Sequence, residues 1–345
     1  MAGVKAYVPG EQPKGEVLLK LNTNESPYPP SPRVREAVAN SVAGLNRYSD
    51  IDCTGLGSAF CGVFGTKENN LLFTNGSDEA LFYCFMAFCD GERGIVFPDI
   101  TYGFYSVYAD VCGVKARKIP LGEDFSVNIE DYFGVGATVL IANPNAPTGL
   151  ALTASQVEKI VINNPDNVVI IDEAYTEFSD TTSRHLVDKY DNLVIVGTFS
   201  KSRYLAGARL GYIIADESLI ADINKVKFSV NPYNVNTLTQ AAGVAALEDN
   251  GYYVNLCAEI CRVRDAFAGA LTEIGFEVIH SECNFVFARH PDFDGEYITN
   301  QLKSRGILIR HFSGKRTSPY IRVTIGTQEN MEIVLSAIKQ IIGGE

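Results

Sequence analysis

Residues 167–174 read NVVIIDEA and residues 193–200 read LVIVGTFS, and these two apolar runs indicate the fold. Similar runs occupy residues 94–99 (GIVFPD) and 137–144 (ATVLIANP). Continuous apolar runs of this kind are typical of parallel strands whose two faces are both covered. Stretches with a helical pattern, such as residues 153–161, lie between them. Strands that alternate with helices predict an α/β sheet that binds ligands beyond the carboxyl ends of its strands.

The pattern changes after about residue 240. A long helical stretch is followed by short β runs that are separated by helices, namely FEVIHS, NFVFARH, GILIRHF and YIRVTIG. This part predicts a smaller α+β domain that shares its flank with the N-terminal arm. We therefore expect a large domain over residues 44–240, with a mostly parallel sheet covered by helices. The arm and the small domain would consist of residues 1–43 together with 241–345.

Composition excludes several classes of protein. The chain has 345 residues, 46% of them hydrophobic and 20% charged, which is typical of a globular fold. A net charge of -12 without a basic cluster disfavours nucleic-acid binding, because phosphate neutralisation needs concentrated positive charge. No stretch is long and apolar enough for a signal peptide or a membrane span. The 8 cysteines are scattered without a metal-binding spacing. We expect a cytoplasmic protein without a metal site.

One strand end carries a lysine and an arginine. Residues 198–212, TFSKSRYLAGARLGY, place Lys201 directly after an apolar strand. A single lysine means little, because most lysines are solvated surface residues. Arg209 lies among apolar and glycine residues, where an unpaired charge would be costly. It therefore needs an anionic partner, which a bound phosphate or an internal carboxylate could supply.

A second strand end carries Asp172, which closes the run NVVII. Its carboxylate could belong to a buried ion pair, bind a metal or contact a ring nitrogen. The lack of nearby His or Cys residues argues against metal binding. The strand before it in the sequence, TVLIA, ends in NPNAPTG at residues 143–149. Two prolines predict a rigid turn there, in which Pro147 could be cis.

Residues 74–80, TNGSDEA, begin a further helix. The free N–H groups at a helix N-terminus bind phosphate well, and Gly76 allows the backbone to approach closely. A plain N-cap by Ser77 or Asp78 explains this segment equally well when it is taken alone.

Taken together, these segments resemble the fold-type I aminotransferases that depend on pyridoxal 5'-phosphate (PLP), and most closely the branch that acts on histidinol phosphate. The resemblance covers nearly the whole chain. The matching segments are KLNTNESPYPPSP (20–32), LNRYSD (45–50), NGSDE (75–79), PNAPTG (144–149), DEAYTEF (172–178), FSKSRYLAGARLGY (199–212), PYN (232–234), NFVFAR (284–289), GILIR (306–310) and IRVTIG (321–326). The resemblance implies an aspartate-aminotransferase-like fold.

The resemblance also implies a role for each matching residue. Lys201 would bond covalently to the cofactor and later shuttle a proton, Asp172 would keep the pyridine nitrogen protonated, and Tyr175 would hold the ring hydroxyl oxygen. The other cofactor ligands would be Gly76, Ser77, Asp78, Tyr102 (stacked on the ring), Asn145, Thr198, Ser200 and Arg209. Tyr48 would reach the phosphate of the neighbouring subunit's cofactor, which implies a homodimer with shared active sites. The residues on the substrate side would be Asn24, Tyr28, Arg310 and Arg322, with Tyr233 a weaker candidate.

The chain departs from the family pattern at three places, one of which is NESPY (24–28) in place of the commoner NENPY. The family has an asparagine that contacts the ring oxygen where this chain has Ala146. Asn145 is adjacent, but successive side chains of an extended segment point in opposite directions. Arg203 and Tyr204 replace a more apolar pair after the lysine, and the sequence assigns no role to this extra cation.

The resemblance implies a transaminase that passes the amino group of histidinol phosphate to 2-oxoglutarate by ping-pong half-reactions. Two other activities share this scaffold, namely a threonine-phosphate decarboxylase and an aromatic-amino-acid aminotransferase. The intact segments 20–28 and 45–50 favour the transaminase. A PLP-binding transcription regulator is disfavoured, since no added DNA-binding domain is evident.

Overall fold

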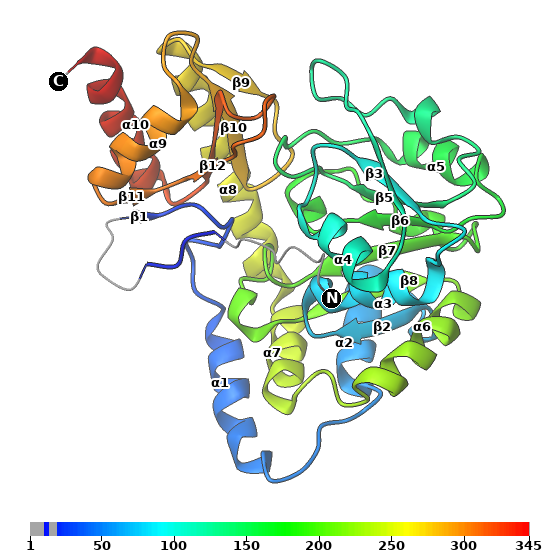
Figure 1. Ribbon diagram of the computed structural model, residues 1–345. Coiled ribbons are helices and arrows are strands. Elements are labelled where there is room, and N and C mark those ends of the chain that lie inside the picture. Colours follow the sequence, from blue (N-terminus) through cyan, green and yellow to red (C-terminus); the bar gives the residue numbers. More distant parts are fainter. Residues whose placement is uncertain (1–9, 14–18, 345) are drawn as a thin grey trace.

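The computed structural model describes residues 10–13 and 19–344, and it has a large and a small lobe (Figure 1). The large lobe is built on a sheet of seven strands in the order β2-β8-β7-β6-β5-β3-β4. The strands are β2 (Leu71–Thr74), β3 (Ile95–Pro98), β4 (Ala116–Ile119), β5 (Thr138–Ala142), β6 (Val169–Asp172), β7 (Leu193–Thr198) and β8 (Gly211–Ala215). β8 runs antiparallel to both of its neighbours, β2 and β7, and the other pairs of neighbouring strands are parallel. The predicted, mostly parallel sheet is confirmed.

Alternate residues of the central strands enter two different cores, as expected for a sheet covered on both faces. In β7, Leu193 and Ile195 pack into one core, whereas Val194 and Val196 pack into the other. The first core includes side chains of α2 (Thr54–Phe64), α5 (Ala154–Ile162), α7 (Thr237–Glu248) and α8 (Asn250–Glu273). The second includes side chains of α3 (Gly76–Phe88), α4 (Phe104–Cys112) and α6 (Glu217–Val230).

The small lobe has an antiparallel sheet in the order β12-β13-β10-β9, which confirms the predicted α+β part. Its elements are β9 (Glu277–Ile279), β10 (Phe285–Arg289), α9 (Gly295–Ser304), β11 (Ile307–Leu308), β12 (Arg310–His311), β13 (Tyr320–Thr324) and α10 (Gln328–Gly343). The N-terminal arm joins this lobe through β1 (Leu19–Lys20), which pairs with β11. Helix α1 (Pro32–Ser41) packs against α7, while α8 extends from the large lobe into the small one (Figure 1). The domain boundaries at residues 44 and 240 stay a prediction.

Short 3₁₀ helices connect several of these elements. They are η1 (Val42–Gly44), η2 (Glu68–Asn70), η3 (Ile129–Tyr132), η4 (Thr176–Phe178), η5 (Arg184–Leu186) and η6 (Ala206–Ala208). Within residues 10–13 and 19–344, no helix is both long and apolar enough to cross a membrane.

The sheet places the predicted chemical groups together. Strands β5, β6 and β7 are parallel neighbours, and their register sets Ala142 beside Asp172 and Asp172 beside Val196. The segments that follow these strands therefore leave the sheet at one edge. This edge is where ligands of open α/β sheets bind.

Candidate active site

A cavity lies at the carboxyl ends of β5, β6 and β7, and most of the predicted cofactor residues line it. Those that do are Ser77, Asp78, Tyr102, Asp172, Tyr175, Thr198, Ser200, Lys201 and Arg209. Ala142, Pro144, Ala146 and Ala174 complete the lining. Residues as far apart in the sequence as Ser77 and Arg209 thus form one site.

Lys201 supplies an amine that loses its proton readily. Burial and the nearby guanidinium of Arg322 lower the pKa of its ammonium group to about 8, because both disfavour the charged form. Its Nζ atom donates a hydrogen bond of 3.1 Å to the backbone carbonyl of Thr23, in the N-terminal arm. A lysine nucleophile must be neutral to attack a carbonyl carbon, and this environment favours the neutral form.

Asp172 is a buried carboxylate whose partners are neutral. Its Oδ2 accepts a hydrogen bond of 2.8 Å from the hydroxyl of Tyr105, and its Oδ1 accepts one of 3.1 Å from the backbone N–H of Ala174. Burial raises the pKa of Asp172 to about 6, although both hydrogen bonds act in the opposite direction. A cation beside this carboxylate would offset the cost of burying it, and a protonated ring nitrogen fits that requirement.

Helix α3 begins at the mouth of the same cavity. Its N-cap is Asn75, which makes no side-chain capping bond, so the alternative of an N-cap at Ser77 or Asp78 is wrong. Gly76 has φ +79°, and a Cβ atom there would lie 2.5 Å from Nη2 of Arg209. Glycine is required at this position because the guanidinium lies directly over its Cα.

Arg209 and two hydroxyl groups stand next to the start of α3. Nη2 of Arg209 lies 2.9 Å from Oδ2 of Asp78, and the arginine side chain is 45% exposed, so an internal carboxylate does balance its charge. Thr198 donates a 3.0 Å hydrogen bond to Oγ of Ser200. Backbone N–H groups, hydroxyls and a guanidinium together suit a phosphate group.

Tyr102 and Tyr175 lie at other walls of the cavity. The hydroxyl of Tyr102 donates a 3.0 Å hydrogen bond to Oδ1 of Asp78, whose carboxylate therefore holds both Tyr102 and Arg209. The hydroxyl of Tyr175 accepts a 2.8 Å hydrogen bond from Nδ2 of Asn24, and burial raises its pKa to about 12. Tyr175 is therefore a protonated donor at neutral pH.

Asn145 does not line the cavity, whereas Ala146 does. The Oδ1 atom of Asn145 accepts a hydrogen bond of 2.8 Å from Thr101, and its Nδ2 donates to the carbonyl of Ile100 and to Thr148. Its side chain thus stabilises the turn. The peptide bonds before Pro144 and Pro147 are both cis, as expected for Pro147.

The predicted substrate residues lie in the arm and the small lobe. Arg310 and Arg322 face each other across β12 and β13. Their guanidinium carbons lie 5.5 Å and 5.3 Å from the ring centroid of Phe312, and Arg322 donates a 3.1 Å hydrogen bond to the carbonyl of Asn22. The ring of Tyr28 lies 6.3 Å from that of Tyr204. The two arginines offer positive charge to an anionic substrate.

Tyr48 lies outside the cavity of its own chain. It is 83% exposed and stacks on Tyr233, with the ring centroids 4.6 Å apart. Such an exposure suits a residue that meets another subunit.

Two features of the site were not predicted. One is Tyr105, which lies one helical turn after Tyr102 and holds Asp172; the sequence signal was a second tyrosine in the segment PDITYGFY. The other is the Thr23 carbonyl, for which no sequence signal exists because every residue has a carbonyl.

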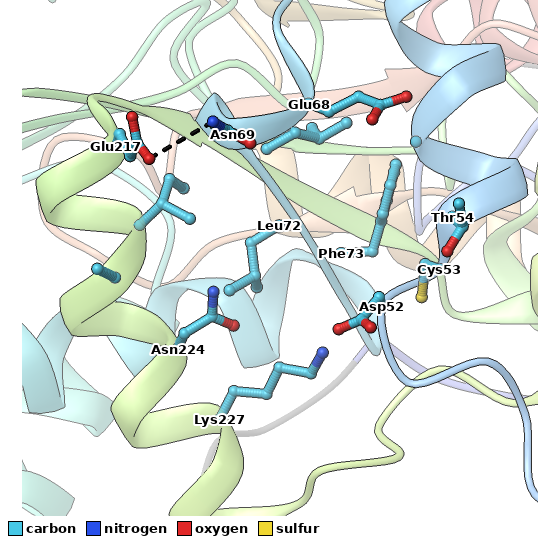
Figure 2. A pocket seen from close by; sticks show the side chains of 14 residues that line it. Asp52, Cys53, Thr54, Glu68, Asn69, Leu72, Phe73, Glu217, Asn224 and Lys227 are labelled. Carbon is cyan, nitrogen blue, oxygen red and sulfur yellow. Dashed lines mark hydrogen bonds between the residues drawn. The ribbon is translucent and has the colours of Figure 1, made fainter.

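A separate cavity lies between β2 and α6 (Figure 2). Asn224 and Lys227 of α6 and Asp52 are among its lining side chains, and Nζ of Lys227 donates a 2.8 Å hydrogen bond to the carbonyl of Ile51. None of the predicted cofactor or substrate residues lines it. This cavity is therefore separate from the predicted cofactor site.

The two-lobed α/β fold and a site that combines Lys201, Asp172 and Arg209 define a class of transaminases. The family described as Aminotransferase class I and II matches residues 16–338, and the chain belongs to this family.

Particular members are similar over nearly the whole length. The histidinol-phosphate aminotransferase of Brachyspira hyodysenteriae is 46% identical over 341 residues, which cover 98% of this chain and 96% of that protein. A putative histidinol-phosphate aminotransferase from Erwinia carotovora atroseptica has a TM-score of 0.86 at 26% identity, with 94% of this chain and 96% of that chain covered. The enzyme from Sinorhizobium meliloti, solved with PLP, has a TM-score of 0.88 at 23% identity, covering 95% and 92% of the two chains.

Proposed function

We propose that this protein is a PLP-dependent aminotransferase that converts histidinol phosphate, with 2-oxoglutarate as amino acceptor, in histidine biosynthesis. The observation that carries the proposal is the buried amine of Lys201, with its pKa lowered to about 8, in the same cavity as Asp172 and Arg209. The relative at 46% identity supports the substrate, since it is a histidinol-phosphate aminotransferase over nearly the same length.

The residues of the cavity fit PLP at four points. Bound PLP supplies an aldehyde that condenses with amines and a ring that accepts electrons. Lys201 would contribute the neutral amine and would hold or release a proton at its Nζ atom. Asp172 would hold the proton on the ring nitrogen, and the protonated hydroxyl of Tyr175 would donate a hydrogen bond to the ring oxygen. Arg209, with the start of α3 and the hydroxyls of Thr198 and Ser200, would hold the phosphate.

The substrate side suits an anion. Arg310 and Arg322 lie side by side across two paired strands, and Asn24 and Tyr28 come from the arm next to them. Guanidinium groups bind carboxylate and phosphate through paired hydrogen bonds. The same surface can therefore receive the phosphate of histidinol phosphate in one half-reaction and a carboxylate of 2-oxoglutarate in the other.

A homodimer in the cytoplasm completes the proposal. Exposed apolar residues gather on two segments that the Tyr48–Tyr233 stack joins, namely Val42, Leu45 and Tyr48 on one, and Phe228, Val230 and Tyr233 on the other. Such a patch is typical of an interface. All 8 cysteines are free thiols, which suits a reducing compartment.

The substrate can be tested directly. Purified protein with PLP, histidinol phosphate and 2-oxoglutarate should produce glutamate, with aromatic amino acids as weaker donors. Release of carbon dioxide from threonine phosphate without an acceptor would select a lyase instead. A preference for phenylalanine or tyrosine over histidinol phosphate would select an aromatic-amino-acid aminotransferase.

A further inference from the structure

The guanidinium of Arg203, which the cofactor chemistry does not use, lines a third cavity, distinct from the cofactor cavity and from the one between β2 and α6. Lys201 and Tyr175 line the cofactor cavity, whereas Arg203 and Glu177, each two residues further along, line this other cavity. The two segments that carry the predicted cofactor residues therefore also carry a charge pair, in which Glu177 is partly buried. Arg203 is 4% exposed.

Arg203 contacts Glu177 with two of its nitrogen atoms. Its Nε lies 3.5 Å from Oε2 of Glu177, and its Nη2 donates a 3.5 Å hydrogen bond to Oε1. The pair joins the turn that carries Tyr175 to the turn that carries Lys201. A contact of this kind helps to fix the spacing of the two turns, which also meet where Nζ of Lys201 lies 5.9 Å from the ring centroid of Tyr175.

The arginine also reaches a third element. Its Nη1 donates a 2.7 Å hydrogen bond to Oδ1 of Asn250, the first residue of α8. The guanidinium carbon of Arg203 lies 5.5 Å from the ring centroids of both Phe64 and Tyr253, so its position between the rings is well defined.

The pair is the outer part of a longer network that is buried at Glu173 and Arg203 and partly buried at Arg184 and Glu177. Nη2 of Arg184 lies 3.7 Å from Oε1 of Glu177, and its Nε lies 3.5 Å from Oε2 of Glu173, the residue that follows Asp172. The Glu173 carboxylate also accepts hydrogen bonds from the Thr182 hydroxyl and from the Ser183 N–H. The chain Glu173–Arg184–Glu177–Arg203 thus connects the end of β6 to the turn after β7.

We propose that Arg203 and Glu177 are positioning residues, which hold the Tyr175 turn and the Lys201 turn at the separation that PLP requires. The inference rests on the PLP binding of the proposed function. Neither side chain touches the reacting atoms. A displacement of a reacting group by about 1 Å can cost roughly a hundredfold in rate, so a pair that fixes two turns affects turnover strongly.

The test compares Arg203→Met, Glu177→Gln and the double variant Arg203→Met/Glu177→Met with the unchanged protein. The measurements are the Kd of the apoprotein for PLP, the circular dichroism of the bound cofactor in the visible region, kcat, KM and Tm. We expect the Kd to rise about tenfold and kcat to fall about 10- to 100-fold, with an altered dichroism band and a nearly unchanged KM.

The double variant separates positioning from stability. It leaves no lone charge from the pair, so its Tm should recover relative to Arg203→Met, whereas its Kd and dichroism band should stay altered. Arg203→Lys should restore the Kd for PLP and the dichroism band only in part, because an ammonium group cannot contact both carboxylate oxygens of Glu177 as the guanidinium does.

Asn164→Ala is the matched control. Asn164 is 1% exposed and donates hydrogen bonds to the carbonyls of Tyr132 and Ile160, next to the amino ends of the strands. This variant should lose Tm and keep the cofactor affinity and the dichroism band. The proposal is overturned if the Arg203 and Glu177 variants keep the Kd, the dichroism band and kcat of the unchanged protein. Because the Kd and the dichroism need no substrate, a wrong substrate assignment would leave this test intact.

Discussion

The hydroxyl of Tyr105 lies 2.8 Å from Oδ2 of Asp172 and donates a hydrogen bond to it. Tyr105 is fully buried, and its ring packs edge-on against Tyr102 at a centroid distance of 5.6 Å. The aromatic wall of the cavity is thereby connected to the carboxylate that we propose as the partner of the ring nitrogen.

Tyr105→Phe should keep the ring packing and remove this hydrogen bond. The bond lowers the pKa of Asp172, so its loss should raise that pKa and weaken the hold on a protonated ring nitrogen. We expect kcat to fall about 3- to 10-fold, since one hydrogen bond to a charged group contributes roughly 1 kcal/mol or more. Steady-state kinetics would measure the change, and an unchanged kcat would contradict this role.

Asp172→Asn should stabilise the apoprotein above pH 6 while it abolishes efficient turnover. The pKa of Asp172 is raised to about 6 in the folded state, so folding binds a proton there at lower pH, and the ionised form is costly at higher pH. Relative to the unchanged protein, the gain should be about 1 to 3 kcal/mol at pH 8 and should shrink as the pH falls below 6. Urea unfolding of both apoproteins at pH 8 and pH 5 measures it. A variant less stable than the unchanged protein at pH 8 would argue against a buried, uncompensated carboxylate.

Capture of PLP by the apoprotein should accelerate as the pH rises through about 8. The pKa of Lys201 is lowered to about 8, and only the neutral amine attacks an aldehyde, so the reactive fraction increases through that value and then levels off. Stopped-flow absorbance follows the covalent step. Lys201→Ala should show no such step, and borohydride should fix the cofactor on the peptide that contains Lys201. A label on another lysine would refute the assignment.

Gly76→Ala should weaken PLP binding. The added Cβ would require a left-handed backbone at φ +79° and would lie 2.5 Å from Nη2 of Arg209. We expect a stability loss of about 1 to 2 kcal/mol and a higher Kd for PLP, because the guanidinium must move. The control is Gly62→Ala, in α2. A Cβ atom at this position has no neighbour within 4 Å. Because alanine favours a helix more than glycine does, this variant should be more stable than the unchanged protein by about 0.5 to 1 kcal/mol. Fluorescence titration and thermal unfolding compare the two.

Mixed dimers test the role of Tyr48. Tyr48→Ala and Lys201→Ala should each be impaired alone. If Tyr48 completes the neighbouring site, a dimer with one chain of each kind contains one intact site, so mixing under conditions that exchange subunits should restore activity. Activity that never exceeds the sum of the separate variants would show that Tyr48 is not shared between chains.

The sequence indicated the site residues because each of them lies in a short segment whose residue types and position next to a strand can be recognised locally. Lys201, Asp172 and Arg209 each follow or adjoin an apolar strand, and parallel strands end at one edge of a sheet. The sequence placed Asn145 among the cofactor residues, although successive side chains of an extended segment point in opposite directions; in the structure Ala146 lines the cavity and Asn145 does not.

By itself, the sequence determined the α/β architecture, the family resemblance and the lysine, carboxylate and arginine of the site, since these depend on residue type and local periodicity. Only the tertiary structure decided that Tyr105 holds Asp172, that the Thr23 carbonyl meets Lys201, and that Arg203 joins Glu177. These contacts link segments whose separation is fixed by packing of the whole fold, and no local pattern encodes which buried donor meets which acceptor.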